Sequence, residues 1–206
     1  MELLVLIDMV PTGHYMKGLP LWYVEYVFEK LLCIKKTLLY CKENNIHTYN
    51  VNYIGRINEA GIIVPEDNNE LLYDFDFDYS WNSPTVGCEF DVRTSPWIKE
   101  STSEDNPRII YDKIYYAGAS LDQCVLRTRP ISMLTGYDTD LMKKTMLLDC
   151  CIQDPKPHID SWKEAGNDFF PDDKNIFWDN KKDMMSYINK IIDVHKIDSI
   201  PSLINE

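Results

Sequence analysis

The sequence predicts an α/β fold in which a mostly parallel sheet is flanked by helices in three layers. Two observations carry this prediction. Leu3–Ile7 is a continuous apolar run, which is typical of a strand buried on both faces. A helical pattern over Trp22–Lys42 then separates this run from an alternating segment, His47–Tyr53. The order strand, helix, strand predicts a right-handed parallel crossover.

Two later apolar runs extend the sheet. Lys113–Ala117 and Thr145–Leu148 have strand length, and we expect them to lie beside the first two strands, all parallel. Asp183–Val194 carries apolar residues at helical spacing and predicts a terminal helix that packs on the sheet or on another subunit. The chain of 206 residues is expected to form one domain, 1–206, with 155–206 as a looser C-terminal extension.

The stretch from 55 to 84 has the weakest pattern. Within it, Asp74, Asp76 and Asp78 alternate with two phenylalanines. Three such carboxylates hold Ca²⁺ only if they face one another and further oxygens complete the shell, so an edge strand with a charged outer face is favoured. Pro96–Ile98 is interpreted as a short strand.

Composition excludes several function classes. The net charge of −12 argues against a nucleic-acid partner or an anionic membrane, because both need basic patches. No apolar stretch approaches the roughly 20 residues that span a bilayer. The six cysteines are irregularly spaced and suggest no disulfide framework, and the apolar run at the start is too short for a signal peptide, so a cytoplasmic protein is expected. Cys150 and Cys151 are interpreted as core thiols.

The richest stretch chemically is Ile114–Val125. A strand-like run passes through the small-residue turn Ala117–Ser120 and reaches Cys124 just before a helix start. This order places the cysteine at the carboxyl end of a strand, where ligands bind in open α/β sheets, and near the helix N–H groups that favour a thiolate. Asp8 ends the first strand and Lys99 follows a short one, so a parallel sheet would bring all three to one edge. The alternative is a buried core thiol at Cys124.

These residues also carry a resemblance. Leu4–Met9 resembles the opening strand of the isochorismatase-like cysteine hydrolases, and Tyr116–Val125 with Thr128 resembles their nucleophile motif, G-x-x-T-D-x-C-V-x-x-T. Leu121 stands where threonine is usual. The resemblance covers roughly residues 1–150, and the positions that match the motif are Gly118, Asp122, Cys124, Val125 and Thr128.

The resemblance implies a doubly wound parallel sheet and an Asp–Lys–Cys triad. It makes Cys124 the nucleophile, Asp8 the general base and Lys99 the cation, in a hydrolase that cleaves a small amide or a related C–N or ether bond. It also implies a cis peptide at Ala119–Ser120 and an oxyanion hole formed by the backbone N–H groups of Ser120 and Cys124. The expected partners are a small-molecule substrate and further copies of the chain in a homo-oligomer, with no cofactor.

Three departures leave alternatives open. Val10 stands where the family has glutamine, and Arg93 lies nearer than Lys99 to the usual triad spacing. An arginine there would hold a carboxylate without moving protons. None of the four histidines forms the D-x-H cluster of the nicotinamidase branch, so no catalytic metal is expected. The other readings are a non-catalytic binding or assembly protein and a thiol redox sensor in which Cys150 or Cys151 resolves Cys124.

Overall fold

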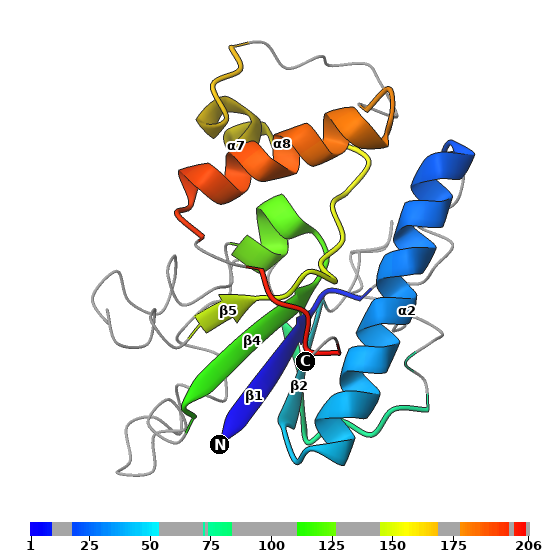
Figure 1. The fold of residues 1–206 in the computed structure, drawn as a ribbon, viewed down its shortest axis with the longest axis vertical. Coiled ribbons are helices and arrows are strands. Elements are labelled where there is room, and N and C mark those ends of the chain that lie inside the picture. Colours follow the sequence, from blue (N-terminus) through cyan, green and yellow to red (C-terminus); the bar gives the residue numbers. More distant parts are fainter. Residues whose placement is uncertain are drawn as a thin grey trace, which may run out of the picture.

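The fold is built on one parallel sheet. The computed structural model describes residues 1–9, 18–53, 72, 74–83, 111–126, 145–168, 178–197 and 200–204. The sheet has five strands, all parallel, in the order β3-β2-β1-β4-β5 (Figure 1). The strands are β1 (Glu2–Ile7), β2 (His47–Tyr53), β3 (Tyr79–Ser83), β4 (Lys113–Gly118) and β5 (Thr145–Leu147).

The predicted strand neighbours are confirmed. β1 lies between β2 and β4, and β5 pairs with the other side of β4. The residues of β1 from Leu3 to Ile7 are at most 2% exposed. Burial on both faces explains why this strand is apolar without alternation.

Helix α2 (Leu21–Glu43) follows β1 and leads into β2, so the predicted crossover is present. Its buried positions recur every three or four residues, as an amphipathic helix that packs on a sheet requires. Asn44 caps the end of the helix, and its backbone N–H donates to the Tyr40 carbonyl at 3.0 Å. None of the described helices is long and apolar enough to cross a bilayer.

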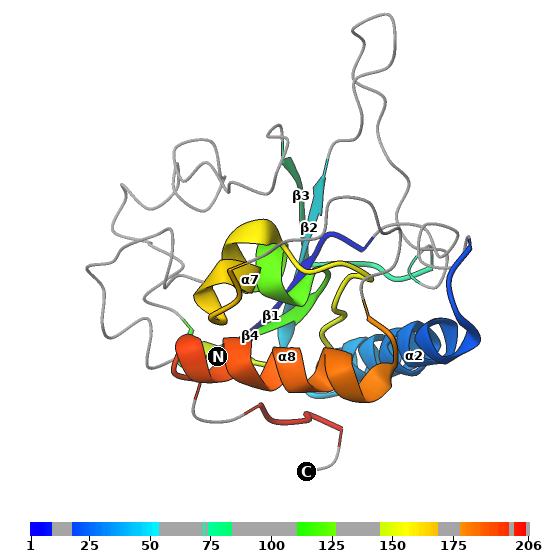
Figure 2. The ribbon, with the colours of Figure 1, turned by 90° about the horizontal axis from the view of Figure 1, so that it is seen from above.

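Two helices of the C-terminal part lie over the carboxyl end of the sheet. They are α7 (Ile159–Glu164) and α8 (Lys181–Val194), the second of which was predicted from its apolar spacing. α8 lies beside α2, as both views show, and Lys181 Nζ is 2.9 Å from the Glu29 carboxylate of α2. Seen from above, α7 and α8 border the region reached by the carboxyl ends of β1 and β4 (Figure 2).

The edge of the sheet differs from the prediction. The strand there is β3, which begins at Tyr79, whereas the aromatic and acidic alternation at 74–78 precedes it. Asp78 explains the boundary, because its carboxylate accepts hydrogen bonds from the Thr48 N–H at 2.7 Å and from the Thr48 hydroxyl at 3.0 Å. Phe75 and Phe77 stack edge to face with their centroids 4.7 Å apart. The short strand predicted at Pro96–Ile98 lies outside the described residues.

Candidate active site

The ends of β1 and β4 define the candidate site. The two strands pair in register, with Ile7 opposite Gly118, so the residues that follow them leave the sheet at the same edge. Asp8 comes directly after β1, half-buried, and its N–H donates to the Val51 carbonyl of β2 at 2.8 Å. Its φ of 47° is in the left-handed region, which aspartate tolerates better than most residues. The sequence prediction that Asp8 lies at the carboxyl edge is confirmed.

Gly118 permits the close approach of the two strand ends. Its φ is +120°, and a Cβ at this position would lie 2.0 Å from the Ile7 carbonyl oxygen. Only glycine fits there, because the backbone of β1 occupies the space of a side chain. The next residue, Ala119, donates its N–H to the Ile7 carbonyl at 2.9 Å, and this bond carries the pairing one residue beyond β4.

The turn after β4 has the conformation that the resemblance implied. The Ala119–Ser120 peptide is cis, and Leu121–Val125 then forms a single π-helical turn. The Ser120 carbonyl accepts from the Val125 N–H at 3.0 Å. The Ser120 N–H has no hydrogen bond to another described residue, and this N–H is one of the two expected at the oxyanion hole.

Cys124 lies within this turn and is 6% exposed. Its sulfur is in a disulfide bond, whereas Cys33, Cys41, Cys150 and Cys151 are free thiols. The sequence predicted a free thiol at Cys124, so the structure differs on this point. A sulfur in a disulfide cannot act as a base-activated nucleophile until it is reduced, because the thiolate is the reactive form.

The third triad position cannot be placed. Lys99 and its alternative Arg93 lie outside the described residues, as do Val10 and Thr128. The convergence of Asp8, Lys99 and Cys124 therefore stays a prediction.

Asp122, two residues before Cys124, is the centre of a buried hydrogen-bond network. Its carboxylate accepts from the Tyr187 hydroxyl at 2.6 Å, the His158 N–H at 2.8 Å and the Ser120 hydroxyl at 3.1 Å, and the residue is only 2% exposed. The Asp122 carbonyl also accepts from the Ser161 hydroxyl at 2.7 Å. Burial and the Asp122 charge raise the pKa of Tyr187, so its hydroxyl remains a donor. The network fixes the turn that carries Cys124 to α7 and α8.

A second carboxyl group lies next to this network. The Asp154 N–H donates to the Ser120 hydroxyl at 3.3 Å, and the Asp154 carbonyl accepts from the Trp178 indole at 3.1 Å. Burial first, and then repulsion from Asp122, raise the pKa of the Asp154 carboxyl from 3.8 to about 7, and the nearby Ser120 hydroxyl lowers this pKa only in part. The residue as a whole keeps some solvent exposure. The Asp154 carboxyl therefore gains and loses its proton near neutral pH.

Two tyrosines of helix α2 hold the segment around Gln153, which lies beside the turn that carries Cys124. The Tyr23 hydroxyl donates to the Gln153 carbonyl at 2.8 Å, and the Tyr26 hydroxyl accepts from the Gln153 N–H at 3.0 Å. Ile152 extends the sheet by a bridge to Ala119. The Gln153 amide is fully buried, and neither of its polar atoms has a hydrogen-bond partner within the described part of the chain.

Sequence reasoning missed most of these supporting residues. Asp122 was noted only as a motif position. No pattern in the sequence indicates that Asp154 is buried or that it lies close to Asp122. Tyr187 was one residue in a helical pattern, and its spacing on α8 gives no sign that its hydroxyl reaches a turn 65 positions earlier. The apolar face of α8 was the only available signal.

Comparison with known proteins identifies the fold. No protein-family model matches the chain, and no curated protein matches it in sequence. Solved structures do match. An isochorismatase family protein from Desulfovibrio vulgaris superposes with a TM-score of 0.55 at 13% identity, over 97% of this chain and 93% of that chain. The N-carbamoylsarcosine amidase from Thermoplasma acidophilum superposes with a TM-score of 0.50 at 14% identity, over 80% and 90%. The chain therefore has the isochorismatase-like fold.

Proposed function

We propose that the protein is a cysteine hydrolase that cleaves a small amide or a related C–N or ether bond, with Cys124 as nucleophile and Asp8 as general base. The observation that carries the proposal is the pairing of β1 with β4, which sends Asp8 and the Cys124 turn to the same edge of the sheet. The nucleophile motif around Cys124 supports it. The amidase from T. acidophilum shares the fold, which supports an amide as substrate.

The proposed reaction with an amide has two stages. Asp8 accepts the thiol proton of reduced Cys124, whose sulfur forms a C–S bond with the substrate carbonyl carbon. The N–H groups of Ser120 and Cys124 stabilise the oxyanion of the tetrahedral intermediate. Its collapse breaks the C–N bond, and the amine leaves with the proton held by Asp8. Asp8 then takes a proton from water, which attacks the thioester, and the thiol and the acid product are released.

In this scheme Lys99 supplies a positive charge that favours the thiolate and the carboxylate together. Arg93 could fill the same electrostatic role but not a proton-transfer role, because a guanidinium stays protonated. The Lys99→Met and Arg93→Met variants separate the two assignments. Loss of turnover in the first alone assigns the triad position to Lys99.

The test compares the reduced wild-type protein with Cys124→Ser and Asp8→Asn on a panel of small amides. We expect both variants to lose at least the roughly 100-fold that one general base contributes, since each removes a group that acts on the reacting atoms. Cys151→Ser is the matched control. It changes a buried free thiol whose hydrogen bond to the Tyr116 carbonyl a hydroxyl can replace. Equal turnover in wild type and Cys124→Ser would refute the proposal.

A second candidate is a thiol redox protein, and the disulfide at Cys124 favours it. The resolving thiol predicted from the sequence does not match, because Cys150 and Cys151 are free in the structure. Dithiothreitol separates the two functions. A hydrolase gains turnover when Cys124 is reduced, whereas a redox protein without hydrolase activity shows only a reversible change in thiol count under peroxide.

A further inference from the structure

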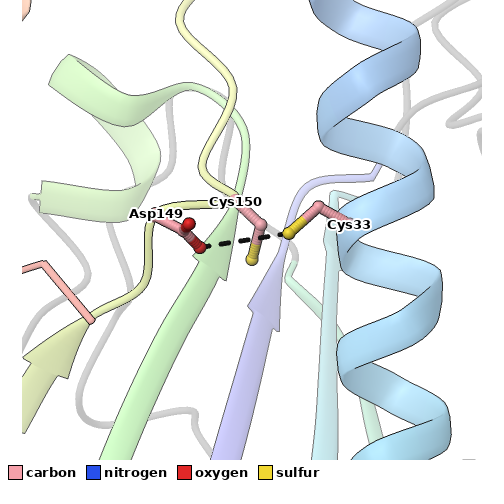
Figure 3. A group of neighbouring side chains, drawn as sticks. All are labelled: Cys33, Asp149 and Cys150. Atoms are coloured by element: carbon pink, nitrogen blue, oxygen red, sulfur yellow. Dashed lines mark hydrogen bonds between the residues drawn. The ribbon is translucent and has the colours of Figure 1, made fainter. Parts of the chain in front are cut away.

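A second group of reactive side chains lies between α2 and the segment after β5. It consists of Cys33, from the middle of α2, and the adjacent residues Asp149 and Cys150 (Figure 3). The two sulfur atoms and a carboxylate oxygen all lie within 4.8 Å of one another, and Cys33 Sγ is 3.9 Å from Asp149 Oδ1. We call these three residues the thiol–carboxylate cluster.

A lysine side chain of α2 holds the backbone of the cluster at Asp149. Lys30, one turn before Cys33 on α2, donates from Nζ to the Asp149 carbonyl oxygen. The same ammonium lies 5.8 Å from the centroid of the Tyr26 ring, so the Lys30 side chain is fixed at two points. Cys150 is fully buried, whereas Cys33 and Asp149 keep partial exposure. The three donors therefore meet at a fixed place with one side open to solvent.

The donor set indicates the class of ligand. Zinc takes thiolate sulfur at about 2.3 Å and carboxylate oxygen at about 2.0–2.2 Å in tetrahedral sites, so donors that share one zinc ion lie roughly 3.5–3.8 Å apart. The measured 3.9 Å between Cys33 Sγ and Asp149 Oδ1 is close to that spacing. Thiolate ligands select zinc and other soft ions over magnesium and calcium, which prefer oxygen.

The charges of the cluster also suit a divalent cation. Both thiols would lose their protons when the ion binds, so two thiolates and one carboxylate would carry three negative charges, of which a divalent ion leaves one. The Lys30 ammonium at the Asp149 carbonyl balances that remaining charge. A monovalent ion would leave the buried side of the cluster with an uncompensated charge, which is costly.

We propose that Cys33, Asp149 and Cys150 bind one thiophilic divalent cation of the zinc class, with water in the fourth position on the open side. The bound ion would tie α2 to the segment that follows β5, and its binding free energy would add to the stability of the fold. The site uses neither Asp8 nor Cys124, so it stands or falls independently of the proposed hydrolase.

The test uses the full chain, reduced and stripped of metal. Zn²⁺ is titrated by calorimetry, and Co²⁺ is used as a spectroscopic probe because thiolate ligation gives charge-transfer absorption in the near ultraviolet. We expect one ion per chain, thiolate bands with Co²⁺ and a rise in melting temperature with added Zn²⁺. Cys33→Ser and Asp149→Asn should each weaken binding by more than the roughly 10–100-fold that loss of an outer-shell partner costs.

Cys151→Ser is the matched control. Cys151 is adjacent to Cys150 and is also a buried free thiol, but it is not part of the cluster. It should bind Zn²⁺ as wild type does. Absence of Zn²⁺ binding in wild type, Co²⁺ spectra without thiolate bands, or unchanged affinity in Cys33→Ser would each overturn the proposal. If Cys33→Ser does not fold, unchanged affinity in Asp149→Asn, which alters a partly exposed side chain, overturns it in the same way.

Discussion

The hydrogen bond between Tyr187 and Asp122 gives the sharpest test of how the turn that carries Cys124 is held in place. Tyr187→Phe removes the hydroxyl that lies 2.6 Å from the Asp122 carboxylate. The ring stays, and with it the packing against Trp178 at 4.9 Å and Trp162 at 5.6 Å between centroids. The substitution therefore removes this buried, charge-assisted hydrogen bond together with the hydrogen bond between the hydroxyl and Ser161.

The expected loss follows from the burial of the carboxylate. A hydrogen bond to a charged group contributes about 1.5–3 kcal/mol to stability. Asp122 is 2% exposed, so water does not replace the missing donor, although Ser120 and His158 still donate to the carboxylate. We expect Tyr187→Phe to lose about 1.5–3 kcal/mol of the free energy of unfolding, which for a chain of this size lowers the melting temperature by about 3–12 °C.

The assay is urea unfolding of wild type and variant at pH 7, with the midpoint shift read at constant slope. Tyr115→Phe is the matched control, since its hydroxyl donates to Glu2 at 2.8 Å while the Glu2 side chain is 33% exposed. It should lose less than about 1 kcal/mol, because water replaces the donor at an exposed carboxylate. Equal losses in the two variants would refute the argument from burial. So would a double-mutant cycle with Asp122→Asn that is additive within about 0.5 kcal/mol.

Three further predictions concern the turn, the second carboxyl group and the assembly. Gly118→Ala should lower the free energy of unfolding by about 1–3 kcal/mol through overlap with the Ile7 backbone, and by a similar amount because φ is positive at this position. A urea unfolding midpoint within error of the wild-type value would contradict the close approach of the two strands. Because the pKa of Asp154 is raised from 3.8 to about 7 on folding, it keeps its proton while the unfolded chain loses one, and its contribution to stability falls between about pH 4 and pH 7. Asp154→Asn should flatten that fall in unfolding midpoints measured at pH 5 and pH 7.5, and an unchanged slope would assign the fall to other groups. The chain should form a homo-oligomer through the exposed apolar residues of α2, which include Phe28 at 43% and Leu32 at 52% exposure. Leu32→Glu should then reduce the mass measured by light scattering, and a wild-type monomer would exclude the assembly.

The sequence predicted the sheet well because burial of the strands requires apolar residues, which are visible in the sequence. Leu3–Ile7 is apolar throughout, and only a strand covered on both faces needs this. The spacing on α2 and α8 predicted both helices for a similar reason. β3 was placed too early, because the start of this edge strand depends on the Asp78 carboxylate, which takes the Thr48 N–H 30 residues away. No local pattern encodes that contact.

Some features of the candidate site could be predicted from the sequence and others could not. Asp8 and Cys124 follow strand ends, and strand ends can be read from apolar runs. The disulfide state of Cys124 cannot be predicted from such runs, because it depends on which other sulfur the fold brings close to it. The pKa of Asp154 was equally hidden, since burial and a charge 32 residues earlier in the chain cause it. The thiol–carboxylate cluster joins α2 to residues 116 positions later, and its two cysteines gave the sequence no spacing to recognise.

The position of the Asp122 network bears on catalysis as well as on stability. Asp122 lies two residues from Cys124, and Ser120, which donates to it, carries one of the N–H groups proposed for the oxyanion hole. An oxyanion donor is effective only if it is already in place, because reorganisation during the reaction cancels its benefit. Tyr187 reaches none of the reacting groups directly, so it acts as a positioning residue. If the hydrolase proposal holds, Tyr187→Phe should lower kcat more than it raises KM, and the melting temperature should fall in parallel. A variant that loses stability while its kcat remains unchanged would confine the network to a structural role.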